Sequence, residues 1–286
     1  GAGSISTMTK AQAVTQLPAE AEGMEAGTTV TAELLVDAGE LAHTLVCVGS
    51  HDNTLDTLAD RLMRRNPPIR LASSHVGSMG GLIALKNGAA MVAGSHLFDP
   101  ATRDYNFPFL AKYLPGLDVL VVNLAIRHQG LIVAPGNPKG ITGVADLARP
   151  DVRYLNRQRG AGTRILLDHH LALNGITPEQ VQGYGREEHT HMAVAVNVLT
   201  GAADCGLGVY AAARALGLDF VPLARERYDL VMPSAFRDDP KIAAVLEVVA
   251  GDAFKAQVQA MGGYEVDWTG QVMQPGQGLP GEPALA

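Results

Sequence analysis

The chain has 286 residues, of which 47% are hydrophobic and 18% charged. That length suits about two domains, or one domain with two lobes, and the apolar content is ample for packed cores. The formal net charge of −7 disfavours a general nucleic-acid binder, because such proteins carry a basic domain or stripe.

Residues 1–40 differ in pattern from the rest of the chain. They contain one strand-like run at residues 29–35 and no alternation of helix and strand. We therefore predict a short β segment there that belongs to a neighbouring structural unit.

From about residue 43 short apolar strands alternate with helical patterns. Strand-like runs at residues 45–50, 69–74 and 89–95 are separated by helical stretches, an order that predicts a mainly parallel sheet with crossover helices. A second series of the same kind follows residue 151. Within it, residues 192–199 fit a helix and a strand equally well, because their apolar pattern has both periods.

Two extended segments, at residues 118–136 and 219–233, flank the second series. They predict that the chain crosses twice between two lobes. The expected fold is α/β and two-lobed, with two mixed, mainly parallel sheets and a two-strand hinge. The predicted parts are a β segment at 1–40, lobe one at 41–127 and 224–270, lobe two at 128–223, and a Pro- and Gly-rich disordered tail at 271–286.

Serine–histidine pairs follow three predicted strands of lobe one. The carboxyl ends of parallel strands face one crevice, where ligands bind, and hydroxyl and imidazole groups donate hydrogen bonds that suit an anion. The alternative is that these are ordinary loop residues. The candidate ligand-binding residues of lobe one are Ser50, His51, Ser74, His75, Ser78, Ser95 and His96.

The stretch NRQRGAGTR occupies the equivalent place in lobe two. Its Gly-Ala-Gly-Thr turn follows a strand and begins a helix, so free N–H groups and the helix dipole favour a negative charge. The spacing of a phosphate-binding P-loop is absent. Arg164 on an exposed helix face remains an alternative. The candidates here are Arg157, Arg159, Gly160, Gly162, Thr163 and Arg164.

His191 and Tyr210 complete the candidate set. A metal site at His189 and His191 has weak support, because His-x-His lacks further spaced ligands. We favour His191 as a hydrogen-bond donor into the crevice. Tyr210 is expected to close over the ligand, and packing is the alternative.

Two kinds of chemistry are disfavoured. The glycines at 206 and 208 have the spacing of a dinucleotide fingerprint, but the preceding strand is short and carries Asp204. Ser50, His51 and Asp52 are consecutive, so they cannot form a triad among themselves, and a nucleophile elbow is absent. We therefore expect no cofactor, no metal and no hydrolase activity.

The expected compartment is the cytoplasm. No uncharged apolar run reaches the ~18 residues that a membrane helix requires, and the first twelve residues lack the apolar segment of a signal peptide. Cys47 and Cys205 lie in apolar runs, where buried thiols are expected rather than a disulfide.

The ordered motifs VGSHD, SSHVGSMGGLIAL, AGSHLFDPATRDYN, NRQRGAGTRILLD and GYGREEHTHMAVA carry a family resemblance over about residues 43–268. They resemble the periplasmic-binding-protein-like (type II) domain that is fused to MoeA-type molybdopterin molybdotransferases or to helix-turn-helix regulators. The resemblance implies a two-lobed fold related to molybdate-binding and LysR effector domains. Residues 1–36 are similar to the end of a MoeA C-terminal domain, which implies MoeA-type enzyme domains as partners in a parent chain.

The sites and the resemblance together predict a binding module rather than an enzyme. Its expected ligand is a small oxyanion, with molybdate or tungstate ranked first, which the module senses or supplies for molybdenum cofactor synthesis. The alternative is an effector-binding domain for an organic anion that regulates the attached enzyme. We expect neither nucleic acid nor a membrane as a partner.

Overall fold

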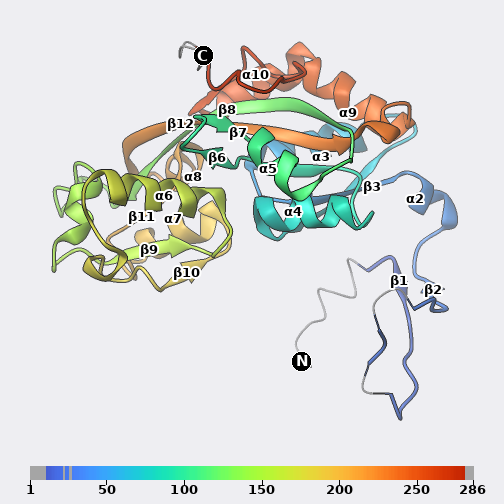
Figure 1. Cartoon of the computed structure of the whole chain (residues 1–286), viewed down its shortest axis with the longest axis horizontal. Coiled ribbons are helices and arrows are strands. Elements are labelled where there is room, and N and C mark those ends of the chain that lie inside the picture. Colours follow the sequence, from blue (N-terminus) through green and yellow to red (C-terminus); the bar gives the residue numbers. More distant parts are fainter. Residues whose placement is uncertain (1–10, 22, 26–27, 281–286) are drawn as a thin grey trace.

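Two lobes, each built of helices packed on strands, are joined by a pair of long strands (Figure 1). The structure is a computed structural model and describes residues 11–280 except 22 and 26–27. The joining strands are β8 (Val119–Val133) and β12 (Asp219–Pro233), which pair antiparallel along their length. The predicted two-lobed α/β fold is confirmed.

Lobe one contains the parallel pair β3 and β4, and a single parallel bridge from Cys47 to Val92 connects β3 to the segment before β5. β5 pairs with β12 and β13 pairs with β8, both antiparallel. The strands are β3 (Thr44–Gly49), β4 (Arg70–His75), β5 (Ala93–Ser95), β6 (Phe98–Asp99), β7 (Asp104–Tyr105) and β13 (Tyr264–Glu265). The helices are α3 (Asn53–Met63), α4 (Gly77–Lys86), α5 (Phe107–Tyr113), α9 (Pro240–Ala250), α10 (Asp252–Met261) and a 3-10 turn at Ser234–Phe236.

Lobe two continues the same sheet in the order β10-β9-β11-β8. Residues 192–199 belong to a helix, and the Thr190 side chain caps it by accepting from the Ala193 N–H at 3.0 Å. The strands are β9 (Tyr154–Arg157), β10 (Glu187–Glu188) and β11 (Cys205–Val209). The helices are α6 (Gly162–Leu173), α7 (His191–Leu199), α8 (Tyr210–Ala215) and 3-10 turns at Val144–Ala148 and Pro178–Gln180.

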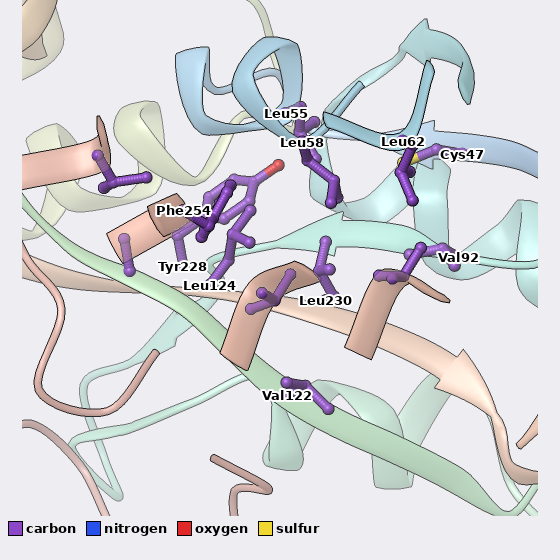
Figure 2. Close-up of a cluster of buried hydrophobic side chains, with 14 of the residues drawn as sticks. Cys47, Leu55, Leu58, Leu62, Val92, Val122, Leu124, Tyr228, Leu230 and Phe254 are labelled. Carbon is purple, nitrogen blue, oxygen red and sulfur yellow. The ribbon is translucent and has the colours of Figure 1, made fainter. Parts of the chain in front are cut away.

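Each lobe has hydrophobic cores of its own. In lobe one, Leu58 of α3 and Phe254 of α10 pack against Leu124 and Leu230 of the long strands (Figure 2). In lobe two, a separate cluster includes Leu167 of α6. The long strands contribute to both cores and are the chain connection between the lobes.

The N-terminal segment extends away from lobe one (Figure 1). Its strands β1 (Ala13–Val14) and β2 (Glu33–Leu34) pair antiparallel, and α2 (Ala38–Ala42) links them to β3. Residues 1–10 lie outside the described part of the chain, so a β segment is observed only for the remainder of the predicted range. The predicted lobe boundaries stay a prediction.

The expectation of a disordered tail does not hold for residues 271–280. Leu279 is buried, and the carbonyls of Gly278 and Pro280 accept hydrogen bonds of 3.0 Å from Arg227 and Arg225. A guanidinium group carries five N–H donors, and the composition of residues 271–280 does not show that their carbonyls accept from it. Residues 281–286 lie outside the described range.

Both cysteines are buried free thiols, as predicted. Among the described residues, no helix has the length and apolar character needed to cross a bilayer.

Candidate functional site

Charged and polar side chains lie at the middle of the two long strands, where the chain passes between the lobes. Arg127 of β8 lies opposite Glu226 of β12, and Gln129 lies opposite Ala224. The side chains of Arg127, Gln129 and Glu226 are all buried. Register shifts in the pairing flank this segment at Pro222/Ala224 and Tyr228/Asp229, and bulges of this kind bend and twist a strand.

Arg127 is held by two carboxylates. Its Nη1 donates to Asp52 Oδ2 and its Nε donates to Glu226 Oε2, both at 2.7 Å. Asp52 is also the N-cap of α3 and accepts from the Thr54 N–H. Burial lowers the pKa of Arg127, and the two carboxylates outweigh that effect and raise it. The remaining nitrogen, Nη2, is buried without a hydrogen-bond partner.

His96 links this ion pair to the Ser-His loops of lobe one. Its Nδ1 lies 2.6 Å from Glu226 Oε1 and its Nε2 lies 2.8 Å from Ser50 Oγ. Its backbone N–H donates to Ser78 Oγ at 3.2 Å. Burial lowers the pKa of His96, and the charge of Arg127 adds to that effect against the opposing Glu226. Three predicted residues, Ser50, Ser78 and His96, are therefore brought together.

Ser50, His96 and Glu226 have the order of a nucleophile, a base and a carboxylate, assembled from distant positions. Their side chains are buried, and Glu226 also accepts from Arg127 and from Gln129. Burial would raise the pKa of Glu226, but Arg127 and His96 lower it to about 2. Because the Glu226 carboxylate is hydrogen-bonded to Arg127, Gln129 and His96, it fixes the orientation of the His96 ring. We therefore assign Ser50, His96 and Glu226 a positioning role.

Arg157, at the end of β9, is a buried arginine of lobe two. Its Nε and Nη2 donate to the backbone carbonyls of Glu188 and His189 at 3.2 and 2.9 Å, and its Nη1 is buried and unpaired. Within the described chain no carboxylate forms an ion pair with it. Burial lowers the pKa of Arg157 to about 10, and the nearby charge of Arg127 contributes. Arg157 is thus a buried cation without a counterion.

His191, the first residue of α7, has both ring nitrogens buried and unpaired. Burial lowers its pKa well below the ordinary value, and the charges of Arg157 and Arg127 lower it further. The imidazole is therefore neutral at pH 7 and has one N–H to donate. The ring lies against β11, where a Cβ added to Gly208 would come within 3.5 Å of its Nδ1.

Two helices begin at the contact between the lobes without a side-chain cap: α6 at Gly162 and α4 at Gly77. In the described chain, the N–H groups of Gly162 and Thr163 have no hydrogen-bond partner. A Cβ on Gly162 would collide with the His96 ring, and one on Gly77 would lie 3.3 Å from the Gly160 carbonyl. The lobes are therefore closed against each other at these glycines.

Buried polar groups without partners cluster where the lobes meet. Each such group costs about 1–3 kcal/mol, and native structures contain few of them. Several together indicate that a polar partner belongs there, and the two guanidinium nitrogens among them, which can only donate, favour an anion. The unpaired atoms at this place are Arg127 Nη2, Arg157 Nη1, Gln129 Oε1 and the Nδ1 and Nε2 of His191.

Several predicted residues lie outside this cluster. Ser74 and His75 are exposed at the end of β4, which pairs only with β3 and is an edge strand. His51 packs edge-on against His75 with ring centroids 4.5 Å apart, and its Nε2 lies 3.6 Å from Asp56. The Ser95 hydroxyl donates to Asn106 Oδ1 at 2.7 Å, so it is used inside lobe one.

In lobe two, Thr163 joins the cluster by accepting from Gln129 Nε2 at 3.4 Å. Arg159 is a rim residue with a side chain 88% exposed. Arg164 is buried, against the alternative of an exposed face, but it pairs with Glu187 and lies over the Tyr184 ring at 4.5 Å.

Tyr210 packs edge-on against Phe220 and contacts Gly263. This position agrees with the alternative prediction, in which Tyr210 packs against its neighbours and does not close over a ligand. In the described chain, no group of three or more His, Cys, Asp or Glu side chains is arranged to hold a metal ion.

Four residues of the cluster are not predicted from the sequence: Asp52, Arg127, Gln129 and Glu226. The available signal was the polar runs RHQ at 127–129 and RER at 225–227 inside otherwise apolar strands. Buried strands tolerate such side chains only when they are paired, so these runs mark positions with a specific partner.

Comparison with known proteins agrees with this architecture. Residues 59–250 match the family model of the PBP superfamily domain. The chain is 36% identical over 230 residues to "Uncharacterized protein YvgK" of Bacillus subtilis, covering 80% of this chain and 73% of that protein.

Two solved structures share the fold. One is a putative phosphate ABC transporter substrate-binding protein with bound phosphate from Clostridium perfringens, with TM-score 0.56, 12% identity, and coverage of 76% of this chain and 97% of that one. The other is the tungstate ABC transporter structure from Geobacter sulfurreducens, with TM-score 0.53, 13% identity, and coverage of 74% and 95%. At these identities the likeness concerns the fold alone.

Proposed function

The chain belongs to the PBP superfamily, and on that premise we propose that it is a binding module that closes its two lobes on a small oxyanion, with molybdate or tungstate as the ligand. The observation that carries the proposal is Arg157, a buried guanidinium with one unpaired nitrogen and no carboxylate partner. A buried charge requires a partner, and an oxyanion beside His191 and the start of α6 supplies it.

The closeness of the lobes favours a small ligand. His96 touches Gly162, and Gly77 touches Gly160, so the surroundings of the unpaired atoms leave little space for an organic body. A tetrahedral oxyanion presents acceptors in every direction, which suits guanidinium, imidazole and backbone N–H donors. For both reasons we place an organic anion second to a small oxyanion as the ligand of this site.

The identity of the oxyanion and its use are two further parts of the proposal. Molybdate and tungstate are dianions without protons at neutral pH, which matches a site composed mainly of donors. A link to molybdenum cofactor synthesis is supported by the resemblance of residues 1–36 to a MoeA domain end. In that setting the module would sense or supply the oxyanion.

Thermal unfolding of the chain with molybdate, tungstate, sulfate or phosphate tests the proposal. A ligand present at 100 times its Kd adds about 2.7 kcal/mol to the free energy of unfolding, which raises Tm by about 5–11 °C at this chain length. We expect that shift with molybdate or tungstate. A shift with phosphate alone would reassign the ligand, and no shift with any of the four would overturn the oxyanion proposal.

Substituting alanine for Gly162 is expected to weaken oxyanion binding by roughly 5- to 150-fold, the equivalent of about 1–3 kcal/mol of overpacking. The added methyl group meets the His96 ring and holds the lobes apart. Calorimetric titration with tungstate measures the loss, and small-angle scattering measures the opening.

Gly143→Ala is the matched control, since a Cβ there meets nothing within 4 Å and the backbone is extended. The closure argument fails if the two variants bind tungstate equally well.

A further inference from the structure

A cavity of about 550 Å³ lies between the lobes, apart from the cluster of unpaired atoms. Lobe one contributes Phe98, Arg103 and Tyr105, and the long strands contribute His128 and residues 222–225. Lobe two contributes residues of α6, which begins at the oxyanion cluster and continues along this cavity with Leu166, His169 and His170. We name this space the interlobe pocket.

The lining of the interlobe pocket combines an apolar wall with hydrogen-bond donors. The Phe98 ring packs against the rings of Tyr105 and His169, with ring centroids 5.2 and 5.7 Å apart. Leu166 and Leu279 add aliphatic surface. None of its lining residues is an aspartate or glutamate, and the carboxylate of Glu265 behind the lining is held by His128 and Arg225.

Two histidines give the pocket unused donors. The ring nitrogens of His169 and His170 form no hydrogen bond within the described chain. Burial lowers the pKa of His170, and neighbouring His169 adds to that effect, so it is a neutral donor. Arg225 and His128 are already paired with Glu265, so their hydrogen-bond donors are engaged.

We propose that the interlobe pocket is a second binding site, and that its ligand is an organic monocarboxylate with an aromatic body. Its volume is within the range of about 300–1,000 Å³ that is typical of small-molecule sites, and it is too large for a tetrahedral oxyanion. The aromatic body packs against Phe98 and Leu166, and the carboxylate accepts from His169 or His170.

A ligand in the interlobe pocket affects the balance between the open and closed arrangements of the two lobes. Both lobes line the pocket, so a ligand there favours the closed arrangement over the open one. Two ligands that favour one arrangement bind with positive coupling, and the coupling is reciprocal. This consequence rests on the proposed oxyanion function, whereas binding in the pocket does not.

Benzoate and phenylacetate are suitable probes, with benzamide as the uncharged control. Proton NMR of the whole chain follows the histidine ring signals, assigned with His169→Gln and His170→Gln. We expect saturable shifts of these two signals with at least one carboxylate, with Kd below about 1 mM, and weaker shifts with benzamide. No saturable shift with either carboxylate, or equal binding of benzamide, would overturn the proposal.

Variants separate the pocket from general surface binding. Phe98→Ala is expected to weaken carboxylate binding at least 5-fold, and Leu173→Ala, on the exposed end of α6, to leave it unchanged. If Phe98→Ala does not fold, the wild-type NMR titration decides. Adding tungstate is expected to tighten carboxylate binding about 5-fold or more. Unchanged binding in the presence of bound tungstate would refute the coupling, and carboxylate binding without any tungstate binding would refute the proposed function alone.

Discussion

Replacing Arg157 by methionine is expected to weaken oxyanion binding by at least about 30-fold, because removing one partner of a buried charge pair costs about 2–5 kcal/mol. The same change should leave the stability of the free chain equal or higher. Burying a charge without a counterion opposes folding, and its removal offsets the loss of the two hydrogen bonds that Arg157 donates to the carbonyls of Glu188 and His189. Calorimetric titration with tungstate measures the affinity, and urea unfolding measures the stability.

Arg159→Met is the matched control, two residues along and with a side chain 88% exposed. It should bind tungstate as the unsubstituted chain does. The central role of Arg157 is refuted if Arg157→Met retains full affinity, or if Arg159→Met loses as much. A large loss of stability in Arg157→Met would show instead that the arginine belongs to the folded framework.

The contrast between these arginines shows where sequence interpretation stops. The alternation of strands and helices predicted two lobes, and the carboxyl ends of the strands predicted where Ser50, His96 and Arg157 would gather. The motif itself could not say which arginine faces inward. Arg157 ends β9, where a shift of one residue reverses the face on which a side chain lies. Arg164 lies on α6 instead and is turned toward Glu187 and Tyr184.

The long strands show a second limit. Arg127 and Glu226 are 99 residues apart, and their pairing depends on the register between β8 and β12, which no local pattern specifies. The ordered residues 271–280 make the same point, because their carbonyls satisfy Arg225 and Arg227. Local chemistry predicted the donors, and tertiary pairing determined which donors remain for a ligand.

Arg127→Met is expected to lower the free energy of unfolding by about 3–5 kcal/mol, the usual cost of removing one member of a buried ion pair. Asp52 and Glu226 would remain buried without their cation. At this chain length the loss corresponds to a fall in Tm of about 6–20 °C. Differential scanning calorimetry without ligand measures it.

The double variant Arg127→Met/Glu226→Gln should recover part of that loss, because a neutral amide removes one of the two unpaired charges while retaining an acceptor for His96. Arg225→Met is the control on the same strand, since its pair with Glu265 is partly exposed and such pairs contribute about 1 kcal/mol or less. If Arg127→Met lowers the free energy of unfolding by no more than Arg225→Met does, the buried ion pairs of Arg127 do not stabilise the joining strands. A recovery in the double variant without recovery of tungstate binding would indicate that Arg127 contributes its unpaired nitrogen to the ligand as well as holding Glu226 against His96.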